Sequence, residues 1–249
     1  MIDRRTAVAL LASPLVLSGC GGAAAASRPE PALPPAPGPA SAPTTAPQTS
    51  AAPAPRRIPG LGPRTWAAIP ARSRQVVVAT GRGRNSPLST VVLYERTANG
   101  WQAGAGGPGH NALHGWSDHH MAGDLRSPVG VYTLTDAGGR LPYPGTRLPY
   151  DHSNGFASTG TGFEGEPLTG SFDYVIAIDY NREPGTSPLD WTRPLGASRG
   201  GGIWIHVDHG GPTHGCLGIA KAHMRELLRA LDPHRHPVVA MGYADWLAR

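Results

Sequence analysis

One short segment of the chain, residues 202–219, gathers residue types that suit nucleophilic chemistry. It reads Gly-Ile-Trp-Ile-His-Val-Asp-His-Gly-Gly-Pro-Thr-His-Gly-Cys-Leu-Gly-Ile, which is typical of two strand-like pieces joined by a glycine–proline turn. Alternation along the first piece places Trp204 and His206 on one face, and the turn can bring His206 beside Cys216. A thiol with a reference pKa of about 8.5 is mostly protonated near neutrality, and a neighbouring imidazole activates it by taking or sharing the proton.

The residue before the cysteine adds a second chemical feature. Gly215 lets the backbone turn tightly, and the amide groups of Gly215 and Cys216 could stabilise a tetrahedral oxyanion. The chain holds two cysteines, and Cys216 has no disulfide partner if Cys20 is lipidated. A lone thiol in an oxidising compartment favours a functional role, although a buried, inert cysteine is the alternative.

The first 20 residues indicate export. A short basic start is followed by an apolar run over residues 7–17, which is too short for a membrane-spanning helix of about 20 residues. Leu17-Ser18-Gly19-Cys20 resembles the lipobox of bacterial lipoproteins, which implies cleavage before Cys20 and its lipidation. An ordinary secretory signal with a chance cysteine is the alternative. We expect an exported protein, anchored by lipid to the outer face of the cell membrane.

Residues 21–63 are expected to form a disordered tether. Twelve of the 27 prolines lie between residues 28 and 63, and proline blocks the backbone hydrogen bonds of helices and sheets. An extended segment of this composition reaches on the order of 100 Å, which suits work in the cell wall. Residues 64–249 carry 17 basic and 15 acidic side chains, and this near balance excludes a nucleic-acid binder.

The expected globular domain, residues 64–249, is patterned mainly as strands. One amphipathic helix is predicted over residues 221–231, where four apolar residues follow helical spacing before Asp232-Pro233 ends it. The predicted strands are β-branched or aromatic runs separated by Gly, Pro and Asn. They cover residues 75–79, 90–94, 130–135, 174–179, 202–207 and 237–241.

These motifs together resemble a known family. His206 followed by Thr213-His214-Gly215-Cys216-Leu217 is similar to the active-site signature of the L,D-transpeptidase (YkuD) catalytic domain. The segment 123–132 resembles the family's proline–glycine strand entry, and Tyr180-Asn181 lies where members often carry such a pair. The resemblance covers about residues 75–242. It implies a mainly β fold, a mixed β-sheet sandwich or barrel with one amphipathic helix.

The resemblance also implies a reaction. Cys216 would attack the bond between the third and fourth residues of a peptidoglycan stem peptide and form a thioester, which an amine then resolves into a 3→3 cross-link. His206 would be the general base and later the acid, oriented by the carbonyl of Val207, while His214 and Gly215 shape the oxyanion loop. The implied partners are a tetrapeptide donor and an amine acceptor, with no metal or cofactor, and we expect a monomer.

The expected substrate groove is less well defined. Tyr180, Trp204 and Thr213 are its candidate lining residues, although either aromatic side chain could equally belong to the core. Gly218 stands where many relatives carry Arg or Asn, which leaves one stem-peptide contact without its usual residue. The gap between His206 and Cys216 is also shorter than in many members, which predicts a reduced lid.

Two metal-binding alternatives remain open. Imidazoles and a thiolate are suitable zinc ligands, so the motif could instead be a zinc site. Its candidate ligands are His206, His209, His214 and Cys216. A second group of histidines lies in a Gly-rich stretch and is either a solvated loop or a metal site. It consists of His110, His114, His119 and His120.

Two serine-enzyme motifs are not supported by the sequence, and two other functions remain as alternatives. Residues 196–200 match G-x-S-x-G but lack the strand before and helix after that this motif needs, and a Ser-x-x-Lys enzyme is excluded because Lys221 is the only lysine. An L,D-carboxypeptidase would hydrolyse the same bond through the same acyl-enzyme. A non-catalytic, wall-binding lipoprotein, with or without zinc, is the alternative that involves no reaction.

Overall fold

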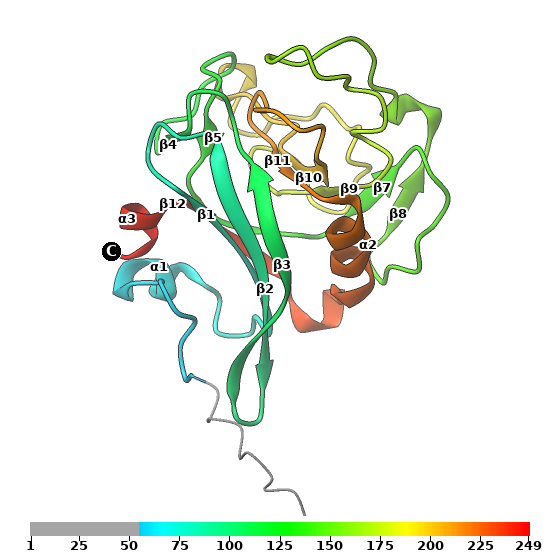
Figure 1. The fold of residues 1–249 in the computed structure, drawn as a ribbon. Coiled ribbons are helices and arrows are strands. Elements are labelled where there is room, and N and C mark those ends of the chain that lie inside the picture. The colour runs from blue at the N-terminus through cyan, green and yellow to red at the C-terminus, as the bar shows by residue number, and fades with distance from the viewer. Residues whose placement is uncertain (1–54) are drawn as a thin grey trace, which may run out of the picture. The chain divides into compact units, whose positions relative to one another are not determined.

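A ten-stranded mixed sheet is the framework of the domain (Figure 1). The computed structural model describes residues 55–249. Neighbouring strands pair in parallel at β1–β12, β10–β11 and β7–β8, and antiparallel elsewhere. In sheet order the strands are β6 (Gly130–Thr133), β12 (Val238–Tyr243), β1 (Gln75–Gly81), β2 (Leu88–Thr97), β3 (Gly100–His110), β11 (Leu217–Ile219), β10 (Trp204–Val207), β9 (Val175–Ala177), β7 (Ala137–Gly139) and β8 (Tyr150–His152).

The remaining elements are short. β4 (Trp116–Ser117) and β5 (Ser127–Pro128) form a separate two-stranded parallel sheet. The α-helices are α1 (Pro63–Ala68), α2 (Lys221–Ala230) and α3 (Ala244–Leu247), and the 3₁₀ helices are η1 (Asn154–Phe156), η2 (Ala197–Arg199) and η3 (Pro233–Arg235). The expected mainly β mixed sheet with one amphipathic helix is therefore confirmed. Within residues 55–249, no helix is long and apolar enough to cross a membrane.

The predicted helix forms because its apolar residues share one face. Met224, Leu227 and Leu228 of α2 are buried, and Leu231 closes the last turn by donating its amide to the Leu227 carbonyl. This face packs on the main core, which β1 also lines through Val77. Its neighbours on the opposite face of β1, Val76 and Val78, join a second cluster together with residues of α3. The strand is thus buried on both faces, which explains its unbroken apolar run.

Strand β3 was not predicted, because five of its 11 residues are glycine. Glycine weakens a strand unless a close contact requires it. Here a Cβ on Gly107 would lie 2.3 Å from the His223 ring, and one on Gly109 would lie 2.2 Å from the Gly218 carbonyl oxygen. The glycines therefore let α2 and β11 pack directly against β3.

The start of the folded part lies earlier than the sequence boundary at residue 64. Ile58 and Leu61 are buried in the second cluster, and the Trp101 amide donates to the Pro55 carbonyl at 2.9 Å. Residues 55–63 of the expected tether thus belong to the packed domain. The predicted signal peptide, Cys20 and the rest of the tether lie outside the described residues.

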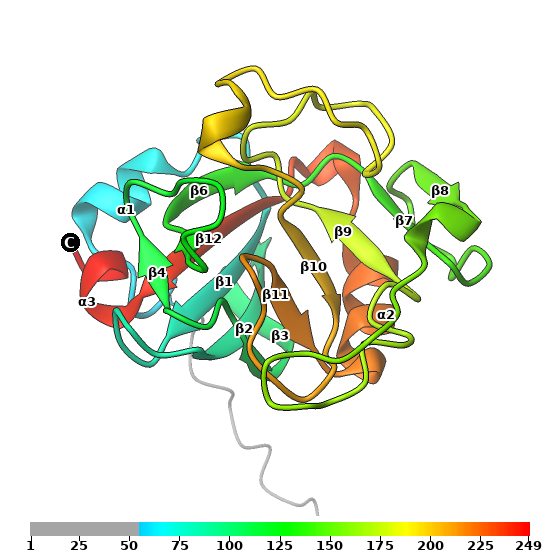
Figure 2. The same cartoon turned by 90° about the horizontal axis from the view of Figure 1, so that it is seen from above.

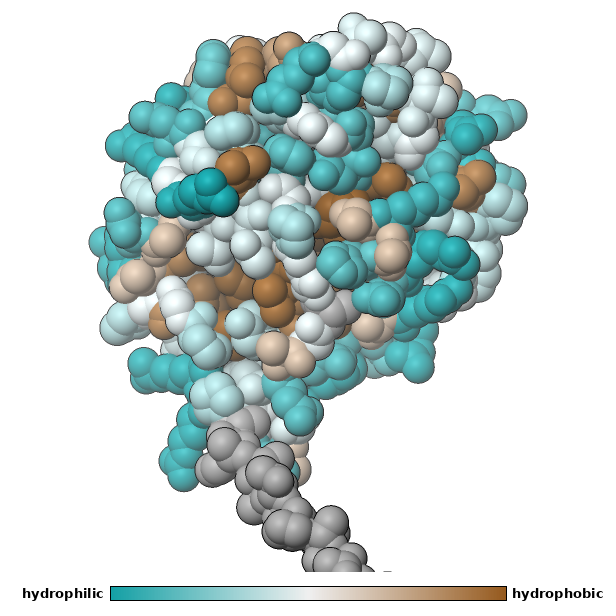
Figure 3. Space-filling view, viewed as in Figure 1, coloured by the Kyte–Doolittle hydropathy of each residue, from teal (hydrophilic) through white to brown (hydrophobic). Residues whose placement is uncertain are grey.

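The surface seen in Figure 3 is mixed in character. Polar side chains cover most of this face, and the hydrophobic residues show as separate patches rather than one continuous area. Seen from above, β10 and β11 lie near the middle of the molecule, with the loop before β9 on one side and the long loop after it on the other (Figure 2). These two loops bound the site described next.

Candidate active site

Strands β10 and β11 bring His206 and Cys216 to the same face of the sheet. Their parallel register pairs His206 with Gly218, and Cys216 lies two residues before Gly218. Side chains two residues apart on a strand share a face. Accordingly, the His206 and Cys216 side chains line one small cavity of about 130 Å³. The proximity on which the sequence argument depends is thus present.

The orientation of His206 is fixed by its own strand. Its Nδ1 lies 2.9 Å from the carbonyl oxygen of Val207, the partner that the resemblance implies. A carbonyl can only accept, so Nδ1 carries the proton and Nε2 of the neutral ring is an acceptor. The edge-to-face ring of Phe172, 5.4 Å away, covers the imidazole. Burial lowers the pKa of His206 to about 4, so the ring is neutral at pH 7.

The Cys216 sulfur is held by backbone groups of the neighbouring strand. It accepts a hydrogen bond from the Trp204 amide at 3.4 Å and donates one to the Gly202 carbonyl at 3.6 Å. Burial raises the pKa of the Cys216 thiol to about 11, and the Trp204 amide opposes this only in part. The resting pair is therefore a neutral thiol and a neutral imidazole, so any proton transfer must accompany attack by the sulfur.

The turn before Cys216 is shaped by three residues. The Thr213 hydroxyl donates to the Cys216 carbonyl at 2.7 Å and so closes the turn. A Cβ on Gly215 would lie 2.8 Å from Cδ1 of Ile203, so a larger residue would require the Ile203 side chain to move. Outside the strand ladders, neither the Gly215 nor the Cys216 amide donates to another described residue. His214 is exposed and packs against Phe163 at 4.6 Å between ring centres.

Two cavities of different size meet at Cys216. The larger, about 400 Å³, is lined by Gly215 and by the loop that precedes β10, whereas the smaller contains His206 and Thr213. His214 and Cys216 line both cavities. A third cavity of about 730 Å³ lies between the ends of β6 and β12 and touches neither Cys216 nor His206. We therefore locate the site by its chemistry and not by cavity size.

The other predicted groove residues have different places. Tyr180 is buried and lines neither cavity; its hydroxyl donates to the Arg199 carbonyl at 2.9 Å, and so it anchors the loop that lines the larger cavity. Trp204 packs between Phe156 and Phe172 and also lines neither cavity. Of the three groove candidates, only Thr213 lines a cavity.

The alternative metal sites do not form. Among residues 55–249, no three His, Cys, Asp or Glu side chains are grouped so that they could hold a metal ion. His209 instead pairs with Glu166 at 3.0 Å. In the second group, His120 pairs with Asp124 at 2.9 Å and His110 with Asp208 at 3.0 Å.

The space beside Gly218 is filled by another residue. A Cβ on Gly218 would lie 2.8 Å from the Asp208 carboxylate, which the ring of His110 and the Gly210 amide hold in place. His110 is the β3 residue that pairs with Gly218. The space beside this position thus holds an acidic side chain that directly follows the adjacent strand β10.

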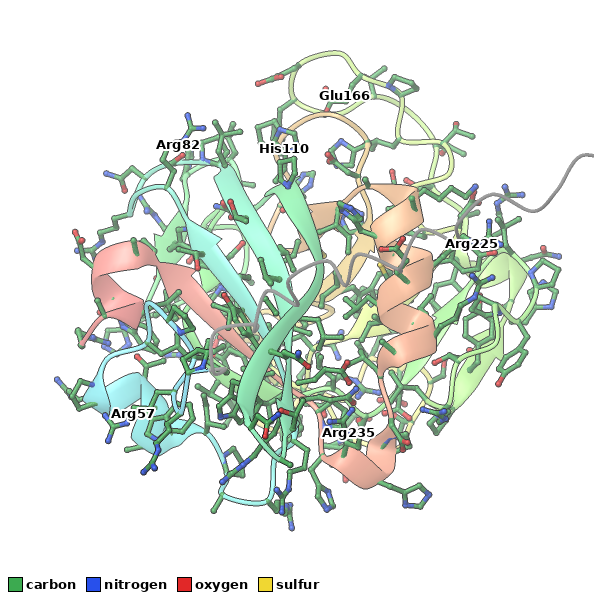
Figure 4. The ribbon with its side chains drawn as sticks, turned by 60° about the horizontal axis from the view of Figure 1, so that its bottom comes forward. Arg57, Arg82, His110, Glu166, Arg225 and Arg235 are labelled. Atoms are coloured by element: carbon green, nitrogen blue, oxygen red, sulfur yellow. The ribbon has the colours of Figure 1, made fainter. Side chains whose placement is uncertain are left out.

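A loop over the smaller cavity was not recognised from the sequence. Its hairpin joins Gly162 to Glu166 by backbone hydrogen bonds, and Leu168 and Ser158 line the cavity. Figure 4 shows Glu166 on this loop. Its carboxylate lies 3.0 Å from Nδ1 of His209. The signal that could have revealed the hairpin is the Gly-x-Gly-x-x-Gly-x spacing over residues 160–166, because such glycines favour a tight turn.

The fold and site define a class: a mainly β domain in which a strand histidine and a cysteine after a tight turn share one cavity. The L,D-transpeptidase catalytic domain model, YkuD, matches residues 72–239, and the chain belongs to this family. The family is cysteine-dependent and acts on the cell wall outside the cytoplasm. No curated protein matches the chain.

Solved structures give weaker likenesses. The helical cell shape determining protein Pgp2 from Campylobacter jejuni is 15% identical with a TM-score of 0.39, covering 70% of this chain and 52% of its own. Bd1075 of Bdellovibrio bacteriovorus is 15% identical with a TM-score of 0.38, covering 68% of this chain and 47% of its own. The chain therefore spans about half the length of these proteins.

Proposed function

We propose that the protein is a cysteine acyltransferase that cross-links peptidoglycan stem peptides of the 3→3 type. The observation that carries the proposal is the small cavity that His206 and Cys216 line together. The proton on Nδ1 of His206 leaves Nε2 of the neutral ring as an acceptor. Family membership supports the reaction class and the cell-wall substrate.

The first half-reaction forms an acyl-enzyme. Nε2 of His206 takes the thiol proton of Cys216 as the sulfur attacks the carbonyl between the third and fourth stem residues. The amides of Gly215 and Cys216 hold the oxyanion that develops. His206 then gives the proton to the departing amine, the carbon–nitrogen bond breaks, and a thioester remains on Cys216.

The second half-reaction reverses the proton transfers with a new amine. The acceptor amine attacks the thioester, His206 takes a proton from its nitrogen, and the sulfur leaves and regains a proton. Leaving and attacking amines must both reach His206, so both belong in the smaller cavity that contains it. The acyl part of the donor then occupies the larger cavity. A volume of about 130 Å³ suits a single small residue such as alanine.

The location of the reaction is a separate part of the proposal. The basic start, the short apolar run and Leu17-Ser18-Gly19-Cys20 support export and lipidation at Cys20, with the proline-rich segment as the spacer. Metabolic labelling with a fatty-acid probe tests this part, because Cys20→Ala should lose the label while Cys216→Ala keeps it. Label on both variants would contradict it.

Intact mass spectrometry tests the chemistry. The wild-type domain, incubated with a tetrapeptide donor, should gain the mass of the tripeptide acyl group, and Cys216→Ala should not. Addition of an acceptor stem peptide whose diamino acid has a free side-chain amine should then yield a dimeric peptide. Release of free tripeptide in the presence of acceptor would instead assign the protein as an L,D-carboxypeptidase. The absence of any adduct on the folded wild type would overturn both reactions.

A further inference from the structure

An arginine outside the sequence motif lines the larger cavity next to the sulfur. Arg193 follows Trp191 in the loop between β9 and β10, and both side chains line the cavity together with Gly201, Gly202 and Cys216.

The guanidinium group lies between an aromatic ring and a glycine backbone. Its carbon is 5.0 Å from the centre of the Trp191 ring, a cation–π contact. A Cβ on Gly201 would lie 2.3 Å from Nε of Arg193, and one on Gly202 would lie 3.5 Å from Nη2. Both glycines have positive φ, 140° and 66°. The glycine pair thus provides the space in which Arg193 lies flat.

Arg193 is a cation without a carboxylate partner among residues 55–249. Its Nη1 donates to the carbonyls of Asp190 and Thr192, at 3.1 and 2.9 Å, whereas Nε and Nη2 have no such acceptor among these residues. No acidic side chain lines the cavity. Two parallel N–H groups of an arginine match the two oxygens of a carboxylate.

The position of Arg193 relative to the sulfur defines what it can reach. Gly202 separates them, because its carbonyl accepts from the Cys216 thiol at 3.6 Å while its Cα faces Nη2 of Arg193. One extended residue spans about 3.5 Å, so a group one or two residues from the attacked carbonyl can contact the guanidinium.

We propose that Arg193 is a specificity-determining residue that binds a carboxylate on the acyl half of the donor peptide. The acyl half is favoured over the leaving residue because Arg193 lines the larger cavity, and His206, which must reach the leaving amine, lines the smaller one. Arg193 also provides a guanidinium near the reacting sulfur of a chain that has Gly218 in place of the usual Arg or Asn. The identity of the bound peptide rests on the proposed acyl transfer. The prediction that Arg193 binds a negative charge rests on the geometry around Arg193 alone.

A small-molecule assay tests the charge without any transferase activity. Iodoacetate and iodoacetamide alkylate the same thiolate and differ by one negative charge. At pH 9 we measure both rates on Cys216, and Arg193→Gln should lower the iodoacetate-to-iodoacetamide ratio about threefold to tenfold. Arg193→Lys should keep most of the ratio.

The matched control is Arg225→Gln, which removes the same charge from an exposed position on α2, pointing away from the sheet (Figure 4). It should leave the ratio unchanged. An equal ratio in the wild type and Arg193→Gln, with thermal unfolding of the two matched, would overturn the proposal.

A donor series tests which carboxylate is bound. Three peptides carry a free carboxylate on the acyl half only, on the leaving residue only, or on neither, with amides elsewhere. Arg193→Gln should raise KM for the first peptide about tenfold or more and leave the other two unchanged. A rise confined to the second peptide, or shared by all three, would overturn the assignment. If no peptide acylates the wild type while the alkylation ratio still depends on Arg193, the proposed function fails and the anion site stands.

Discussion

The His206 ring is tied to the backbone of its own strand: Nδ1 donates to the Val207 carbonyl at 2.9 Å. The bond fixes both the tautomer and the direction of Nε2, and within residues 55–249 no side chain hydrogen-bonds to Nδ1 as a third partner. A backbone carbonyl cannot be protonated or displaced by a rotamer change, so the arrangement is as rigid as β10 itself. The consequences concern reactivity, titration and stability.

Replacing the His206 imidazole should slow the acylation of Cys216. In His206→Gln the amide can still donate to the Val207 carbonyl, but it cannot take a proton from Cys216. We expect the rate of acylation of Cys216 by a carbapenem or a tetrapeptide donor to fall about 10²- to 10⁴-fold, the usual worth of a general base. Stopped mass-spectrometric time courses measure it, with exposed His234→Gln as the control. Equal rates in both variants would remove His206 from the mechanism.

The pH dependence of alkylation should report a neutral resting pair. Because burial raises the pKa of the Cys216 thiol to about 11, the thiolate fraction grows about tenfold per pH unit between pH 7 and 10. The iodoacetamide rate constant should rise with that slope, and at pH 7 it should lie about a hundredfold below that of an ordinary cysteine peptide. A plateau extending below pH 7 would instead indicate a preformed thiolate–imidazolium pair.

Stability should fall on mild acidification because of the same histidine. Its pKa is lowered from 6.5 to about 4 in the folded state, so between these values the unfolded chain binds more protons. The free energy of unfolding therefore decreases as the pH falls through this window, by about 3 kcal/mol for His206 alone. Urea unfolding at pH 7.5, 6.5, 5.5 and 4.5 measures it. The loss should be smaller in His206→Gln by that amount, and parallel curves for the two proteins would show that His206 titrates normally.

The turn before the cysteine depends on one hydroxyl. Thr213→Val keeps the shape of the buried side chain but removes the donor to the Cys216 carbonyl, 2.7 Å away. We expect a loss of about 1–2 kcal/mol in the free energy of unfolding and slower acylation, because the Gly215 and Cys216 amides are no longer held. Thr213→Ser, which retains the hydroxyl, should stay within about 1 kcal/mol of the wild type. If Thr213→Val and Thr213→Ser have the same free energy of unfolding and acylation rate, the hydrogen bond from Thr213 to the Cys216 carbonyl does not organise the turn.

Much of the sheet could be predicted from sequence because burial leaves a pattern. All six predicted runs overlap strands, and the helix ends within one residue of its predicted end. Strand β3 escaped because its glycines serve packing against His223 and Gly218, which no local pattern encodes. Three-residue strands such as β7 and β8 are too short to show alternation.

Some residues of the site could likewise be predicted from the sequence, whereas others could not. His206 and Cys216 could be paired from sequence because only nine residues separate them, and the parallel register of β10 and β11 is consistent with their shared face. Tyr180 was expected in the groove but anchors a loop, since whether an aromatic ring faces a cavity depends on distant segments. Arg193 could not be found for that reason: its place beside Gly202 depends on how a long loop returns to the sheet.

The glycine at position 218 offers a test of how this chain differs from its relatives. Gly218→Ala places a Cβ 2.8 Å from the Asp208 carboxylate, which must then leave His110 and the Gly210 amide. We expect a loss of about 1–3 kcal/mol in the free energy of unfolding. In an Asp208→Ala background the carboxylate contact is gone and the 3.3 Å contact with Cα of residue 208 remains, so the same substitution should cost less, about 1 kcal/mol or below. Chemical denaturation of the four proteins closes the double-mutant cycle. Additive effects would mean that Asp208 is not what excludes a side chain beside His206.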